Sequence, residues 1–232
     1  MTFWDHLEEA RWSIVRMLAA VGVCMVPAFI FMPWIFDHVV LKAAREGGFA
    51  IINIQVASQF TTHLSMSAYL ALIAAMPYIL YEVWKFIRPA LYPHEKKSLR
   101  KGFLLGGVLF YLGCLTGFFI IFPLTFRFLA GYELSHAVVN TINLTSYTGL
   151  FNSIILIFGL CFEMPMLLLV LSLMGILDRD TLKQYRRHAT VGILVLAAVI
   201  TPSGDPVTLL VVFAPLYLLY EFSIFLIKPA RD

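Results

Sequence analysis

Long apolar runs make up most of the chain and alternate with shorter segments that contain most of the charged residues. Four runs have the roughly 20 apolar residues that a helix needs to cross the hydrocarbon core of a bilayer, which is about 30 Å thick. They cover residues 14–36, 64–81, 102–126 and 150–173. Backbone inside lipid must form its own hydrogen bonds, so these runs predict membrane-spanning helices.

Two further apolar runs, residues 189–200 and 207–220, are shorter and flank a turn that runs from Thr201 to Pro206. We interpret them as the fifth and sixth spans, joined as a hairpin. Their short length predicts local thinning of the bilayer beside them. The six spans are then expected at the following positions: residues 14–36, 64–86, 102–126, 150–173, 187–201 and 207–225.

Two segments outside the spans also predict helices. The N-terminal stretch, residues 2–12, places Phe3, Leu7 and Ala10 on one side and carries tryptophans suited to the headgroup zone. We expect it to lie along the inner surface as an interfacial helix before the chain turns into the bilayer. The first outer loop has a candidate short helix around residues 40–46.

Composition supports lipid as the main solvent. The 232 residues are 60% hydrophobic and 13% charged, with a mean hydropathy of +0.85, and a soluble core of this size could not bury so much apolar surface. The three cysteines lie inside apolar runs and suggest neither disulfides nor a metal. The net charge of +3 is modest, and no basic stripe predicts nucleic-acid binding. No cofactor is expected.

The distribution of basic residues predicts the orientation. Of the 17 Lys and Arg residues, only Lys42, Arg45 and Arg127 fall on one side of the predicted spans. The other side is therefore cytoplasmic, and both termini are expected there. We place the chain in a bacterial inner membrane as a single integral membrane domain over residues 1–232.

Ionisable residues inside the apolar runs are candidates for function. Glu163 lies near the middle of the fourth run, where an ionised side chain is reckoned to cost about 3 kcal/mol or more. It either faces a water-bearing recess, which Pro165 would widen by a kink, or forms a neutral hydrogen bond between helices. Arg16, in the first turn of its run, can extend to the headgroups, and Glu221 can reach water or Lys228.

Three strings in the cytoplasmic segments and the fourth span carry a family resemblance. They are His6-Leu7-Glu8-Glu9-Ala10-Arg11, Phe86-Ile87-Arg88-Pro89-Ala90-Leu91-Tyr92-Pro93-His94-Glu95-Lys96-Lys97 and Phe158-Gly159-Leu160-Cys161-Phe162-Glu163-Met164-Pro165. Together they resemble TatC, the receptor subunit of the twin-arginine protein translocase, over essentially the whole chain. The resemblance implies an all-α, concave bundle. It also implies recognition of signal peptides that bear paired arginines and export of folded proteins driven by the protonmotive force.

The resemblance also implies site residues and partners. Glu95 and Glu9 match the family's acidic positions for the two arginines, and Phe86 matches an aromatic that packs the peptide beside them. From chemistry alone, the alternative interpretation of each acid is a solvated surface charge, and that of Phe86 is an interfacial anchor. The adjacent Glu8 could compete with Glu9 for the ligand. The expected partners are TatA, TatB and other TatC copies, which are expected to dock along the fifth and sixth helices. The candidate contact residues are Met164 in the fourth span, Val212 in the sixth and Asp205 in the turn between the fifth and sixth.

Two other function classes remain open from the residues. A proton-coupled solute transporter would use Glu163 as its relay, with Glu82 and Glu221 as auxiliary acids. No inverted repeat supports it. An intramembrane hydrolase would need a nucleophile and base within the spans, but no serine pairs there with a histidine or with paired aspartates.

Glu82 is also the nearest acid to pair with Arg88 on the second helix.

Overall fold

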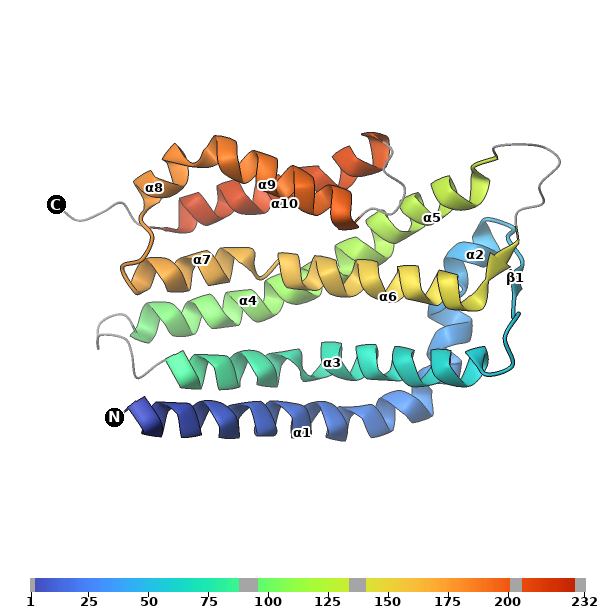
Figure 1. The fold of residues 1–232 in the computed structure, drawn as a ribbon, viewed down its shortest axis with the longest axis horizontal. Coiled ribbons are helices and arrows are strands. Elements are labelled where there is room, and N and C mark those ends of the chain that lie inside the picture. The colour runs from blue at the N-terminus through green and yellow to red at the C-terminus, as the bar shows by residue number, and fades with distance from the viewer. Residues whose placement is uncertain (1–2, 88–95, 134–140, 201–205, 228–232) are drawn as a thin grey trace.

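The computed structural model describes residues 3–87, 96–133, 141–200 and 206–227, and it consists of helices and one very short sheet (Figure 1). The side chains of residues 3–6, 96–101 and 207 are not described. The elements in chain order are α1 (Phe3–Ile35), the π-helical turn η1 (Phe36–Val40), α2 (Lys42–Glu46), β1 (Ile51–Ile52), α3 (Ser58–Ile87), α4 (Lys96–Thr116), the π-helical turn η3 (Gly117–Ile121), α5 (Phe122–Gly131), β2 (Ile142–Asn143), α6 (Leu144–Cys161), α7 (Met164–Leu173), α8 (Arg179–Gln184), α9 (Arg186–Ile200) and α10 (Pro206–Leu226).

Five helical segments among the described residues are long and apolar enough to cross a membrane. They are Leu7–Glu46, Ser58–Ile87, Gly102–Gly131, Leu144–Leu173 and Thr208–Leu226. α9 has 15 residues and would extend over about 22 Å, which is less than the thickness of a hydrocarbon core. The predicted all-α membrane fold is confirmed, and the fifth predicted span is a short helix.

The N-terminal helix differs from its prediction. Instead of an interfacial helix over residues 2–12 followed by a bend, α1 runs without a break over 33 residues, or about 50 Å. No glycine or proline interrupts its first half, and Ser13, at the expected bend, is buried where α1 packs on α3. A helix of this length extends beyond the hydrocarbon core at one or both ends.

Prolines within the long helices leave backbone carbonyls that neighbouring side chains satisfy. Pro33 has no N–H for the carbonyl of Phe29, and His63 of α3 donates to that oxygen from Nε2 at 2.8 Å. Pro77 likewise leaves the carbonyl of Ile73 without its helical partner, and the Tyr111 hydroxyl of α4 donates to it at 3.2 Å. These bonds tie α1 to α3 and α3 to α4 where lipid would offer no alternative donor.

The loops that contain β1 and β2 meet at one end of the bundle. β1 pairs with β2 in parallel, with Ile51 opposite Ile142, so the segments after α2 and before α6 are joined there. The Tyr147 hydroxyl donates to the carbonyl of Val40 at the end of η1, and Phe122 packs edge-on against the Tyr147 ring. The short helix expected around residues 40–46 is present as α2.

Small residues allow α4 and α6 to approach closely. A Cβ atom on Gly113 of α4 would lie 2.5 Å from the carbonyl oxygen of Phe158, and one on Gly159 of α6 would lie 2.8 Å from Cys114 Sγ. Such close approach is how helices pack in lipid, where no hydrophobic force draws them together. It fixes α6, and with it the α6–α7 junction, against α4.

The Tyr111 bond predicts a coupling between two residues. In Tyr111→Phe the Ile73 carbonyl loses its donor, and we expect a loss of about 1 kcal/mol in stability. In Pro77→Ala the backbone N–H of residue 77 can serve the same carbonyl, so adding Tyr111→Phe to that variant should cost little. Thermal unfolding of the four proteins in one detergent measures the cycle. Equal losses from Tyr111→Phe in both backgrounds would contradict it.

Candidate functional site

Glu9 and Phe86 lie at the same end of the bundle, on two helices that pack side by side. α1 begins and α3 ends at this end (Figure 1), so the two residues approach it from antiparallel helices. Glu9 is half-buried, and its Oε2 is enclosed without a hydrogen-bond partner among the described residues. Phe86 is half-buried in the last turn of α3. Glu95 lies outside the described residues.

Glu8 and Glu9 have different environments although they are adjacent. Neighbouring residues on a helix are turned from each other by about 100°, and Glu8 is exposed whereas Glu9 is half-buried. The two carboxylates therefore do not occupy equivalent positions, which favours Glu9 as the one that is held in a defined place.

An ion pair that sequence reasoning did not assign lies about two helical turns from Glu9 along α1. Arg16 donates from Nε at 3.0 Å and from Nη2 at 2.9 Å to Oε2 of Glu82 in α3. Nη2 also donates to Ser13 Oγ, and the Tyr78 hydroxyl donates to the other carboxylate oxygen of Glu82 at 3.1 Å. Glu82 is 2% exposed, so its charge is compensated inside the protein.

This pairing replaces one interpretation made from the sequence, because Arg16 binds a carboxylate instead of extending alone to the headgroups. Glu82 is engaged by Arg16 and Tyr78, and its expected pairing with Arg88 involves a residue outside the described ones. A signal was present in the sequence. Arg16 lies near the start of the first predicted span and Glu82 near the end of the second, so both lie close to the same predicted membrane face, as expected for opposite charges on antiparallel helices.

Glu163 occupies the break between α6 and α7. The α-helix stops at Cys161, Glu163 precedes the first residue of α7, and Pro165 stands in the first turn, which agrees with the predicted interruption. Both carboxyl oxygens are enclosed and have no hydrogen-bond partner among the described residues. A Cβ on Gly106 of α4 would lie 2.7 Å from Oε2. In this packing both oxygens are enclosed and the carboxyl group meets α4, and the role predicted for Glu163 from the sequence stays a prediction.

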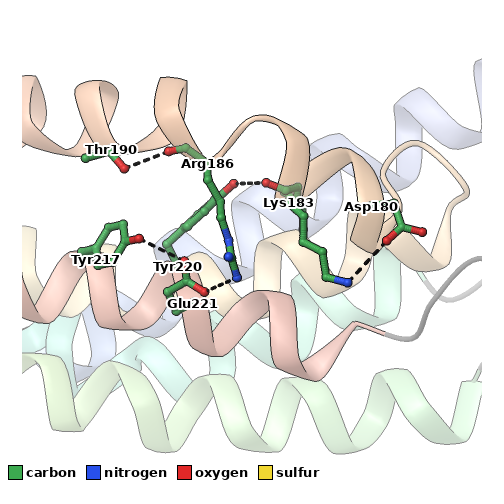
Figure 2. A network of polar contacts seen from close by, with 8 residues as sticks. Asp180, Lys183, Arg186, Thr190, Tyr217, Tyr220 and Glu221 are labelled. Carbon is green, nitrogen blue, oxygen red and sulfur yellow. Dashed lines mark hydrogen bonds and ion pairs between the residues drawn. The ribbon is translucent and has the colours of Figure 1, made fainter.

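A second polar network joins α8, α9 and α10 at the end of the bundle where α1 begins (Figure 2). Arg186 Nη2 lies 2.7 Å from Glu221 Oε2, and the Tyr217 hydroxyl donates to Oε1 of the same carboxylate at 3.1 Å. The Tyr220 hydroxyl donates to the carbonyl of Leu182 in α8. Glu221 was expected to reach water or Lys228, and Arg186 is the partner that the structure provides.

The same end contains a helix cap outside the spans. Asp178 accepts a hydrogen bond from the Thr181 backbone N–H at 2.6 Å and so caps α8. Hydrogen bonds from Thr181 hold the pKa of Asp178 below its usual value. The cap and the Arg186–Glu221 pair together fix the start of the α9–α10 hairpin.

The residues expected to contact partners differ in how far they are exposed. Met164 is half-buried at the start of α7. Val212 is 0% exposed, so a partner helix cannot contact it while this packing holds, and its assignment as a docking residue is not supported. α10 is apolar on all sides, so sequence periodicity could not tell its inner face from its outer face. Asp205 lies outside the described residues.

An apolar pocket lies between α3 and α4 near the end of α3. It has a volume of about 620 Å³. Leu80, Tyr81 and Trp84 line it from α3, and Phe103 and Leu104 line it from α4. It lies within one to two helical turns of Phe86 along α3, so an apolar ligand segment could occupy it next to the predicted site.

The fold and these positions define a multi-pass helical membrane protein in which the two described site candidates, Glu9 and Phe86, lie at one end of the bundle. A family model described as Sec-independent protein translocase protein (TatC) matches residues 5–215. The chain belongs to this family, and the resemblance seen in its sequence is confirmed.

Similar proteins cover almost the whole chain. The Sec-independent protein translocase protein TatC of Koribacter versatilis is 36% identical over 99% of this chain and 87% of its own length. Those of Deinococcus radiodurans and Escherichia coli are each 32% identical, covering 98% and 95% of this chain and 86% and 85% of their own lengths.

Solved structures agree with the arrangement of the helices. A crystal structure of the twin-arginine translocase receptor TatC matches with a TM-score of 0.80 and 31% identity, over 95% of this chain and 97% of that one. A second crystal structure of the receptor, in DDM, matches with a TM-score of 0.84 and 31% identity, over 96% and 99%.

Proposed function

We propose that this chain is the receptor subunit of a bacterial twin-arginine translocase. It captures signal peptides with paired arginines at the cytoplasmic face and, with TatA and TatB, supports export of folded proteins driven by the protonmotive force. One observation carries the proposal: the match to the twin-arginine translocase receptor extends over 96% of the chain at a TM-score of 0.84.

The proposed topology has six spans in the inner membrane and both termini in the cytoplasm. Fourteen of the 17 basic residues then lie on the cytoplasmic side, as the positive-inside tendency requires. The first turns of α1 and the last turns of α10 lie at one end of the bundle, which supports placing them on one side of the membrane (Figure 1).

The proposed peptide site consists of Glu9, Glu95 and Phe86. Carboxylates bind guanidinium groups through paired, charge-assisted hydrogen bonds that lysine cannot reproduce. Glu9 is half-buried and its Oε2 has no partner among the described residues, so the side chain must turn toward the ligand for a guanidinium group to supply the missing donor. The apolar pocket between α3 and α4 is suited to the apolar region that follows the basic part of a signal peptide.

A proton-coupled solute transporter is not favoured. Both of its auxiliary acids, Glu82 and Glu221, are engaged in ion pairs with Arg16 and Arg186. The family to which the chain belongs is a protein-translocase family.

The proposed partners dock along the α9–α10 hairpin. α9 extends over only about 22 Å, so the bilayer beside it must thin or a partner's helix must cover the difference. Exposed side chains on this hairpin include Val199, which is 78% exposed, and Leu210, which is 60% exposed. These replace Val212 as the residues from which contact with TatA or TatB is expected.

Peptide binding to the purified protein tests the receptor function. The wild type should bind a twin-arginine signal peptide more tightly than its twin-lysine version. Glu9→Ala and Glu95→Ala should each reduce that preference by about tenfold or more, because a charge-assisted bond is lost. Glu8→Ala is the matched control, since the exposed neighbouring carboxylate should be dispensable. Unchanged preference in both Glu9→Ala and Glu95→Ala would leave the proposed site without a role.

Cysteine crosslinking in membranes tests the docking surface. With the three native cysteines replaced, Leu210→Cys and Val199→Cys should crosslink to TatA or TatB carrying a cysteine in its single helix. Val212→Cys, two residues from Leu210 and fully buried, should give no product and serves as the control. Crosslinks from Val212→Cys, with none from the exposed positions, would contradict the proposed surface.

A further inference from the structure

The Arg16–Glu82 network lies near the end of the bundle that holds Glu9 and Phe86, and the proposed peptide contacts do not involve it. It contains four hydrogen bonds among Ser13, Arg16, Tyr78 and Glu82, and the two from Arg16 to Glu82 join α1 to α3. Arg16 is 35% exposed and Glu82 is 2% exposed, so the carboxylate is enclosed and the guanidinium lies at the edge of the helix pair. A charge enclosed in this way is tolerated only while its partner stays in place.

Helical spacing connects the network to the peptide site. Arg16 follows Glu9 by seven residues on α1, which is two turns on the same face of the helix. Phe86 follows Glu82 by four residues on α3, which is about one turn. Because α1 and α3 run antiparallel, the contact of Arg16 with Glu82 directs Glu9 and Phe86 toward the same end of the pair (Figure 1).

Apolar packing alone holds α1 weakly. Among the α1 side chains that the structure describes, only Ser13, Ala28 and Met32 are buried, and Ser13 belongs to the network itself. Lipid is as apolar as the helix surface, so burial supplies little force that would fix one helix on another. A slip of α1 by one turn would move Arg16 by about 5.4 Å and leave Glu82 enclosed and unpaired.

We propose that Arg16, Glu82 and Tyr78 are positioning residues, which hold α1 on α3 in the register that presents Glu9 and Phe86 to the same ligand. The inference rests on the proposed function, because the ligand is the twin-arginine signal peptide. The network supplies the geometry of the site and does not touch the peptide.

Two measurements on the same variants test the positioning role. The variants are Arg16→Gln, Glu82→Gln and the exchange Arg16→Glu with Glu82→Arg. Arg127→Gln is the matched control, because Arg127 lies in an exposed pair with Glu46 at 3.6 Å in the outer part of the molecule. The first measurement is the preference for the twin-arginine over the twin-lysine peptide. The second is the distance between spin labels at Leu18→Cys on α1 and Ala74→Cys on α3, with the native cysteines replaced.

Both single substitutions should broaden or shift the label distance by up to about one helical turn, roughly 5 Å, and weaken the arginine preference about tenfold. The exchange variant should recover both properties, and Arg127→Gln should change neither. If the exchange variant recovers the label distance and the arginine preference, the losses in the single variants come from the missing ion pair and not from general destabilisation. This holds also where a single variant does not fold.

Two results would overturn the proposal. One is a wild-type arginine preference and label distance in Arg16→Gln and Glu82→Gln. The other is an exchange variant that folds but recovers neither register nor preference. If the wild type itself showed no arginine preference, the proposed function would fail, while the label distances would still report whether the network sets the register.

Discussion

The structure depends on one constraint: polar groups that enter the apolar part of the chain are stabilised by partners within the protein, and Glu163, whose carboxyl oxygens have none among the described residues, is an exception. Lipid offers no hydrogen bonds, so each such group is satisfied from a neighbouring helix or remains costly. Arg16 binds Glu82, Arg186 binds Glu221, and Tyr111 serves the carbonyl that Pro77 leaves without its helical donor. These bonds determine which helices pack together and in what register.

The same constraint explains why the proposed site lies at the end of the bundle. The Arg16–Glu82 and Arg186–Glu221 pairs occupy acids that could otherwise relay protons, whereas Glu9, nearer the end, keeps an oxygen without a partner among the described residues. Its position follows from α1 being one continuous helix, packed on α3 through Ser13 and Arg16. Recognition of paired arginines would then need no catalytic group, only carboxylates that are held at a defined separation.

Much of the fold could be predicted, because the length of an apolar run and the positions of the basic residues are given by the sequence without any knowledge of how the helices pack. The long spans, the short α9 and the interruption near Glu163 follow from them. The continuity of α1 could not be predicted, because its tryptophans equally suit an interfacial helix. The pairing of Arg16 with Glu82 depends on the register between two helices, and the burial of Val212 depends on which side of an evenly apolar helix faces inward. Of the candidate site, Glu9 and Phe86 are brought to one end as expected from the family resemblance, and Glu95 lies outside the described residues.

A structure of the purified protein with a bound twin-arginine signal peptide, determined by electron cryomicroscopy, tests the account most directly. The account predicts guanidinium nitrogens within about 2.7–2.9 Å of the carboxylate oxygens of Glu9 and Glu95. Phe86 should lie against the peptide, and the Arg16–Glu82 pair should be intact behind it. A peptide whose paired arginines bind at another face of the molecule, away from both carboxylates, would contradict it.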